Sequence, residues 1–73
     1  MENIPLQTSG NIWKILVKVG DKVEEGQVLF IMEVMKMEVD HEASCSGVIQ
    51  AIHINEGDEG LDADMIAITI EPA

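Results

Sequence analysis

The feature that most constrains the fold of this chain is an internal duplication. Residues 9–12 (Ser-Gly-Asn-Ile) match residues 46–49 (Ser-Gly-Val-Ile) at a shift of 37 residues (9 to 46), and the match continues without a gap to the end of the second copy. It places the Gly-Asp pair at 20–21 over the Gly-Asp pair at 57–58. We therefore expect two halves that share one plan and bury each other's apolar faces.

Each half is predicted to form a strand, a turn and a second strand. Apolar residues alternate at a period of two before the first Gly-Asp pair, and a similar run follows the second pair. The first run is Trp13, Ile15, Val17 and Val19, and the second is Ile66, Ile68 and Ile70. With six glycines near turns and weak helix signals, this pattern predicts an all-β fold, a flattened barrel or sandwich.

Composition narrows the classes of function. The 73 residues predict one domain, residues 1–73, near the lower size limit for independent folding. The net charge of -10 argues against binding to nucleic acid or to an anionic membrane surface. No apolar run reaches the roughly 18 residues of a membrane span, and the N-terminus lacks the features of a secretion signal. We therefore expect a cytoplasmic protein, whose only thiol, that of Cys45, forms no intramolecular disulfide.

The segment from residue 30 to residue 39 is ambiguous, because it contains no Gly, Pro, Asn or Asp and fits either a helix or one long strand. The duplication resolves the ambiguity. The second copy ends with the chain, so the matching strand of the first copy, residues 28–34, should end as well. A new alternation begins at Val39. Met35 and Lys36 then form the tip of a hairpin, for which we predict a type I turn because neither residue favours positive φ.

This tip places a lysine between two methionines. For an arbitrary lysine, the simplest interpretation is that it keeps a turn soluble. Natural surfaces, however, avoid adjacent exposed apolar side chains at a loop tip unless something binds there. Methionine also suits contacts that are made with more than one partner. Met35, Lys36 and Met37 together therefore indicate a site of binding or modification.

The motif Glu-Val-Met-Lys-Met-Glu at residues 33–38 resembles the attachment motif of the biotinyl/lipoyl carrier domains, in its biotin form. The likeness covers residues 6–70 and includes a lysine midway between two Gly-Asp turns. It implies a barrel-sandwich hybrid of two four-stranded antiparallel sheets related by a pseudo-twofold axis. It also implies covalent biotin on the lysine. The residues that the resemblance assigns to the cofactor site are Lys36, Met35, Met37 and Glu33.

Three positions depart from the usual pattern of that family. Val34 stands where alanine is usual, and Ser44 stands where a proline usually begins the next strand. Gly60 stands where an apolar residue usually follows the second Gly-Asp turn, a place that Val23 holds in the first copy. Because a gapless repeat leaves no room for the protruding thumb loop of some biotin carriers, the chain is similar to the thumbless type.

The resemblance implies that the chain is a substrate and a carrier, and not an enzyme. An exposed lysine amine is almost wholly protonated at neutral pH, so an external enzyme must deprotonate it and present an activated acyl group. The implied partners are a biotin protein ligase, a biotin carboxylase and a carboxyltransferase. Tethering the cofactor to one body would raise its effective concentration at the last two active sites.

Two other functions remain open at this point. A lipoyl carrier would use lipoate on the same lysine, although Met37 stands where lipoyl domains usually have alanine. An unmodified structural copy of the fold would have no use for the intact lysine motif. The intact mass of the protein separates the three possibilities.

Metal chemistry is not predicted. His41, His53 and Cys45 match no zinc spacing, and the acidic stretch at residues 56–64 lacks the ligand spacing of a calcium loop. His53 aligns with Leu16 in the repeat, so we expect it to be a partly buried strand residue.

The duplication also predicts where the chain ends lie. The shift carries Lys36 onto position 73, so the counterpart of the lysine hairpin is the C-terminus. If a twofold axis relates the halves, the two termini are neighbours, and both are far from Lys36.

Overall fold

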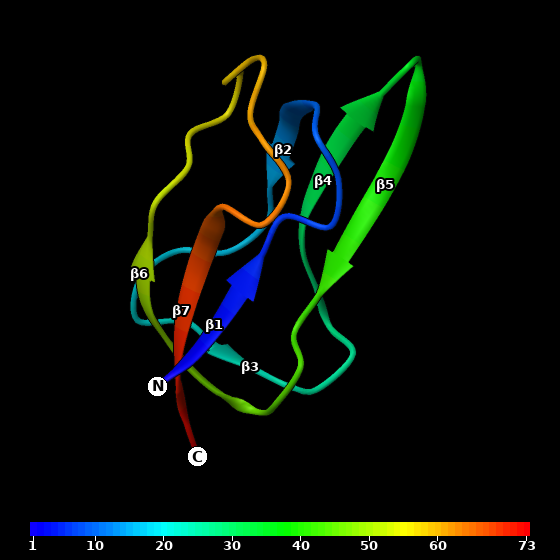
Figure 1. Cartoon of the computed structure of the whole chain (residues 1–73). Coiled ribbons are helices and arrows are strands. Elements are labelled where there is room, and N and C mark those ends of the chain that lie inside the picture. The colour runs from blue at the N-terminus through cyan, green and yellow to red at the C-terminus, as the bar shows by residue number, and fades with distance from the viewer.

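The structure is a computed structural model that describes residues 1–73. It contains seven strands and no helix, and the strands pair in two antiparallel sheets that pack against each other (Figure 1). The strands are β1 (Glu2–Pro5), β2 (Asn11–Ile15), β3 (Lys22–Val23), β4 (Val28–Val34), β5 (Met37–Glu42), β6 (Gly47–Ile52) and β7 (Ile66–Pro72). The prediction of an all-β sandwich is confirmed. No helix that is long and apolar enough to cross a membrane is present.

The two sheets differ in size, so the expected pair of four-stranded sheets is wrong. One sheet has four strands in the order β1-β7-β6-β3, and the other has three in the order β2-β4-β5. In the larger sheet Val23 pairs with Gly47, whereas the matching pair in the smaller sheet is a single bridge between Gly10 and Leu61. Gly60 has a φ of 66°, which takes the chain out of the extended conformation beside Leu61. Leu61, and not Gly60, therefore takes the place that corresponds to Val23.

Matching hydrogen bonds occur in the two halves. The Gly20 amide donates to the carbonyl of Ile49 over 2.8 Å, and the Gly57 amide donates to the carbonyl of Ile12 over 3.0 Å. Donors and acceptors are both related by the shift of 37 residues seen in the sequence. The first Gly-Asp turn is therefore hydrogen-bonded to β6 in the second half, and the second Gly-Asp turn is hydrogen-bonded to β2 in the first half.

The number of residues that separates matching positions of the two copies changes after these turns. The prediction that the copies align without a gap is therefore wrong for the residues that follow the turns. The Gln27 amide donates to the carbonyl of Glu24 over 3.0 Å, and the Met65 amide donates to the carbonyl of Asp62 over 3.5 Å. These bonds match at a shift of 38 residues (27 to 65). The second copy therefore contains one extra residue in the segment that includes Gly60. An extra residue reverses which side chains face the core, because successive strand residues point to opposite faces.

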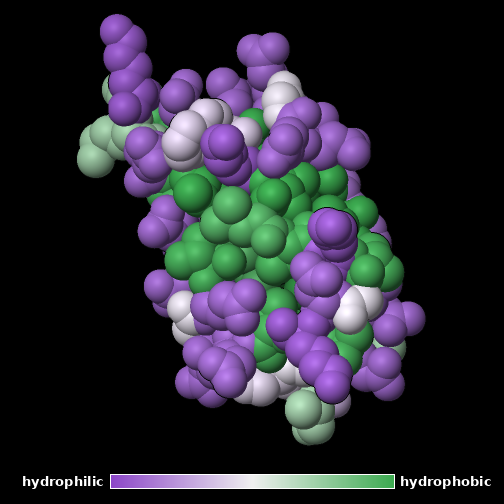
Figure 2. Space-filling model, turned by 180° about the vertical axis from the view of Figure 1, so that it is seen from behind, coloured by the Kyte–Doolittle hydropathy of each residue, from purple (hydrophilic) through white to green (hydrophobic).

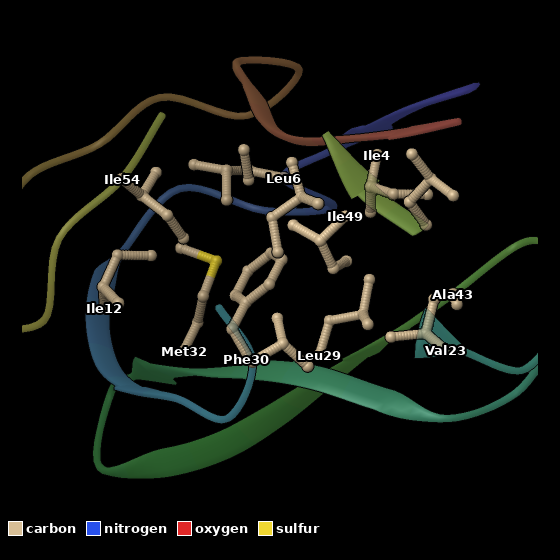
Figure 3. Close-up of a cluster of buried hydrophobic side chains, with 14 residues drawn as sticks. Ile4, Leu6, Ile12, Val23, Leu29, Phe30, Met32, Ala43, Ile49 and Ile54 are labelled. Carbon is tan, nitrogen blue, oxygen red and sulfur yellow. The ribbon is translucent and has the colours of Figure 1, made fainter. Parts of the chain in front are cut away.

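The core lies between the sheets and contains 14 buried apolar residues (Figure 3). Phe30 and Met32 of β4 face Leu6, Ile49 and other aliphatic side chains from the larger sheet and the loops. Phe30 is fully buried, and burying a side chain of this size contributes about 1.5–3 kcal/mol. The strand that leads to Lys36 is therefore anchored at the centre of the molecule.

The first period-two run does not form one buried face, as the sequence had suggested. Trp13 is 44% exposed and Val19 is 62% exposed, whereas Val17 is buried. The register of β2 against β4 shifts between Ile12 and Lys14, so Trp13 is a bulge residue. A bulge breaks the alternation of faces, and Ile12 takes the buried place instead.

The second period-two run, which was predicted to bury Ile66, Ile68 and Ile70 on one face, is only partly buried. Ile68 and Ile70 are fully buried, but Ile66 is 39% exposed. The inward place before Ile68 belongs to Ala67, which is also fully buried. This change follows from a bulge in β7, because Ile68 pairs with Ile4 and Ile66 pairs with Pro5, which leaves Ala67 as the extra residue between them.

The molecule is elongated, with extents of 35 × 17 × 17 Å. β1 pairs with β7, and Glu2 lies opposite Ile70. Both termini therefore lie at one end of the molecule, and the tip of the β4–β5 hairpin lies at the other end (Figure 1). The predicted separation of Lys36 from two neighbouring termini is confirmed.

Candidate functional site

The β4–β5 hairpin carries Lys36 to one end of the molecule. The two strands pair from Val28 opposite Glu42 to Val34 opposite Met37, with one register shift near the start of β4. Residues 35 and 36 remain as a two-residue turn, and Lys36 is exposed. The predicted hairpin, its tip and the end of its first strand at residue 34 are confirmed, whereas the second strand starts at Met37 and not at Val39 as predicted.

The turn has a different geometry from the one that the sequence predicts. Met35 has a φ of 49° and Lys36 has a φ of 67°. Positive φ at both central residues is the mark of a type I′ turn, so the prediction of a type I turn is wrong. A two-residue connection must match the right-handed twist of its strands, and here this requirement outweighs the preference of the residues. Left-handed backbone costs a non-glycine residue roughly 1–2 kcal/mol, so the paired strands hold the tip in a strained conformation.

The methionines on either side of the lysine project into solvent. Met35 is 92% exposed and Met37 is 69% exposed. Covering apolar surface gains about 25 cal/mol per Å², so both side chains gain when another surface covers them. The structure brings Met35, Lys36 and Met37 together at one tip, as the sequence predicts.

Acidic residues lie directly below the tip. Glu33 of β4 is opposite Glu38 of β5, and two strand positions further down Ile31 is opposite Asp40. Like charges that are directly opposite on neighbouring strands destabilise a sheet. Glu33, the remaining residue of the predicted site, is therefore in the hairpin but one residue pair below Val34 and Met37.

Gly10 supports the hairpin from the side, a role that the sequence analysis did not assign. A Cβ atom on Gly10 would lie 2.8 Å from Cγ2 of Val34 and 2.9 Å from the carbonyl oxygen of Glu33. Both distances are too short for van der Waals contact, and the carbonyl of Glu33 belongs to backbone that is held in a sheet. The signal that could have identified it is the repeated Ser-Gly dipeptide, since Gly47 makes a similarly close approach to Glu71.

His41 packs inside the same hairpin. It is fully buried, and its ring stacks on Phe30 with centroids 4.4 Å apart. Nε2 accepts a hydrogen bond from the Gln7 amide over 3.1 Å, and Nδ1 lies 3.3 Å from the carbonyl oxygen of Val39. Burial lowers the pKa of His41, although the hydrogen bond to Val39 and the charge of Asp40 oppose this shift. The contacts fit a neutral ring that donates from Nδ1 and accepts at Nε2.

The other residues considered for metal chemistry do not converge. His53 is exposed and lies just after β6, with Nε2 3.2 Å from Oγ1 of Thr69, so the prediction of a partly buried strand residue is wrong. Cys45 is half-buried and free. No group of three or more His, Cys, Asp or Glu side chains is arranged to hold a metal ion.

Comparison of sequences finds a family model and several relatives. The family model described as biotin-requiring enzyme matches residues 4–70. A biotin/lipoyl attachment protein of Bacillus subtilis strain 168 is 40% identical over 63 residues, which are 86% of this chain and 86% of that protein. A biotin carboxyl carrier protein of Streptococcus mutans is 46% identical over 54 residues, which are 74% of this chain and 42% of that protein. The chain thus spans less than half of the Streptococcus carrier.

Comparison of structures agrees with the fold described above. The urea carboxylase of Kluyveromyces lactis contains a region with a TM-score of 0.82 and 33% identity, which covers 94% of this chain and 6% of that one. The lipoyl domain of the 2-oxoglutarate dehydrogenase complex of Azotobacter vinelandii has a TM-score of 0.75 and 23% identity, covering 96% of this chain and 99% of that one. At this lower identity the likeness shows the fold alone.

Proposed function

The chain belongs to the biotin/lipoyl attachment family, and from this premise we propose that it is a biotin carboxyl carrier with biotin attached to Lys36. The observation that carries the proposal is the exposed lysine at a strained tip between two exposed methionines. The names of two relatives support it, a biotin/lipoyl attachment protein and a biotin carboxyl carrier protein. The carboxylases among the relatives match this chain over a small part of their length, as a carrier domain would.

Attachment requires an amine that another enzyme can reach. Lys36 meets this requirement, because it is exposed and lies at the end of the molecule away from the termini. In the proposed reaction, Nζ of Lys36 attacks the carbonyl carbon of biotinyl-adenylate and forms an amide bond. The bond between that carbonyl and the phosphate breaks, and AMP leaves with its electron pair. We assign removal of the amine proton to a biotin protein ligase.

Met35 and Met37 are the proposed contact residues of the site. Their large exposed fractions and their flexible thioether chains suit them to cover the apolar part of the arm in successive active sites. Glu33 is assigned to recognition by the ligase, because it contributes to the acidic pair directly below the turn. No residue of this chain is assigned a catalytic role.

Bound biotin supplies a ureido nitrogen that accepts a carboxyl group at a biotin carboxylase and releases it at a carboxyltransferase. The chain supplies a rigid body for this transfer. Buried Phe30 and Met32 fix the strand below the tip, so motion is concentrated in the lysine side chain and the attached group. Tethering converts two bimolecular encounters into one with a high effective concentration.

We also propose that a pseudo-twofold axis relates the halves and that residues 1–73 act as one domain in the cytoplasm. The matching bonds of Gly20 to Ile49 and of Gly57 to Ile12 support the axis. The same arrangement leaves the end with both termini available for a linker or a partner, while the lysine end enters active sites.

The proposal is tested by incubating the protein with a biotin ligase, ATP and biotin and measuring its intact mass. We expect the addition of one biotinyl group and none in the Lys36→Arg variant, which keeps an exposed cation at the tip. Lys14, Lys18 and Lys22 should stay unmodified in peptide maps. Modification that persists in Lys36→Arg contradicts the assignment. The mass of the protein from its own host then distinguishes biotin from lipoate and from no cofactor.

A further inference from the structure

We propose that Trp13 is a docking site on this domain for the biotin ring system carried on Lys36. The inference rests on the proposed attachment of biotin to Lys36 and goes beyond it, because it gives the arm a resting position on the surface of its own carrier. The ring system would lie against the indole when the arm is not inside an active site.

The first argument is the unusual exposure of the indole. Trp13 is the only tryptophan of a chain that has no tyrosine, and the only phenylalanine, Phe30, is fully buried. Trp13 nevertheless leaves 44% of its surface in solvent. It lies in the bulge of β2, and bulges redirect side chains at functional sites. A large aromatic surface that the fold could have buried is thus available for a ligand.

The second argument is that the arm can reach the indole. β2 pairs with β4, and Ile12 lies opposite Met32, so Trp13 is close to the level of Met32. Lys36 is four residues beyond Met32, which is roughly 13 Å at the rise of a strand. A biotinyl-lysine arm has about ten bonds between the lysine Cα and the ring system, or roughly 12 Å when extended. The ring system itself spans the remaining distance.

The third argument is the hydrophobic surface on the side of the molecule that carries β2. β2 lies at the back in Figure 1, so Figure 2 views its side of the molecule, where an extended hydrophobic area occupies the middle of the surface. Trp13, Leu16 and Val19 are the exposed large hydrophobic residues of β2 and the loop that follows it. The reduced sulfur-containing ring of biotin is apolar, and its thioether makes favourable contacts with aromatic rings.

Lys14 adds a polar contact to this surface. Its Nζ lies 5.5 Å from the centroid of the Trp13 ring, within the range of a cation–π interaction. The ammonium is therefore held beside the indole and can donate to the ureido oxygen of biotin. An apolar face with an ammonium donor beside it matches a ring system that has an apolar thioether side and a polar ureido side.

The experiment uses Trp13 as its own probe, because its fluorescence is the only tryptophan signal of the protein. The full chain is prepared with and without biotin, the intact mass verifies the modification, and acrylamide quenching is measured on both forms. We expect biotinylation to shift the emission to shorter wavelength and to reduce the quenching constant roughly by half, as for a ring that is docked about half of the time. A tenfold dilution should leave this difference unchanged.

The unmodified Lys36→Gln variant is the matched control, because it removes the lysine charge without adding a ring. It should be quenched like the unmodified protein, and so should the unmodified protein mixed with equimolar free biotin. If the mass shows one biotin but quenching does not change, docking on Trp13 is refuted while the proposed function stands. Docking on Trp13 is also refuted if the difference in quenching between the two forms disappears on dilution, or if the Lys36→Gln variant shows the same reduced quenching as the biotinylated protein. If no biotin is added at Lys36, the proposed function and this inference fail together.

Discussion

Replacing His41 by leucine tests how the lysine hairpin is fixed to the rest of the molecule. The histidine ring stacks on Phe30 of β4 and accepts a hydrogen bond from the Gln7 amide in the loop after β1. It therefore connects the hairpin to the segment that leads into β2. Leucine fills a similar volume but can neither accept this hydrogen bond nor change its charge.

The size of the effect at pH 8 follows from the contacts that are lost. One hydrogen bond contributes about 0.5–1.5 kcal/mol, and a stacked ring pair contributes about 0.5–1.5 kcal/mol beyond its buried area. The His41→Leu variant should therefore lose about 1–3 kcal/mol of unfolding free energy. A chain of 73 residues has a total of roughly 4–11 kcal/mol, so the loss is a large fraction of its stability.

The loss should depend on pH, because burial lowers the pKa of His41 in the folded state. The unfolded chain then binds a proton near the ordinary histidine value of about 6.5, where the folded protein still does not. The stability that comes from the neutral ring is complete above that value, and it falls as the pH drops toward the folded pKa. Protonation would also place a donor on Nε2 against the Gln7 amide. The leucine variant has no such dependence, so the difference between the two proteins should narrow as the medium becomes acidic.

The assay is urea unfolding at several pH values between 5 and 8, followed by circular dichroism. Subtracting the curve of the variant from that of the parent removes the carboxylates and His53, which both proteins share. A difference that stays constant across this range would refute the reasoning, since the buried ring would then titrate as it does in the unfolded chain. A His41→Leu protein as stable as the parent at pH 8 would show that the contact with Gln7 does not stabilise the fold.

Three further variants test the tip and its support. Gly10→Ala should lower the unfolding free energy by about 1–3 kcal/mol in urea melts and slow biotin attachment, because its Cβ meets Val34 and Glu33; unchanged melts would contradict this role. Met35→Asn should raise the unfolding free energy by about 0.5–1 kcal/mol, since asparagine tolerates a left-handed backbone; a loss of stability would argue against strain. Replacing Met35 and Met37 together by leucine should leave biotin attachment intact and slow carboxyl transfer, measured per biotin. Slower attachment with normal carboxyl transfer would show that the ligase recognises the methionines.

The hairpin and the position of the chain ends could be predicted because they follow from where one copy of the repeat stops. Propensity does not separate a helix from a strand between residues 30 and 39, but the end of the second copy places a break at Val34, where β4 ends. The separation of Lys36 from the termini follows from the same repeat. These predictions depend on the topology of the chain and not on details of packing.

The turn type and the faces of two strands could not be predicted, because they depend on how strands meet. Left-handed φ at Met35 and Lys36 arises from the twist of β4 against β5, which no local preference encodes. Bulges at Trp13 in β2 and at Ala67 in β7 each interrupt an alternation. Trp13 and Ile66 therefore leave the faces predicted for them, whereas Val19 is exposed because it lies beyond β2, in the turn at Gly20.

The strain at the tip and the rigidity below it have a joint consequence for the carrier. Left-handed residues persist only where the surrounding structure holds them, and here the Val34–Met37 pair closes the ladder immediately below the turn. A flexible loop would relax to ordinary φ values and would present the lysine in many directions. Because Met35 and Lys36 are held between paired strands, a partner enzyme meets one backbone geometry. If biotin is attached to Lys36 as we propose, the reach of the arm is then set by the lysine side chain and the cofactor, and not by motion of the loop.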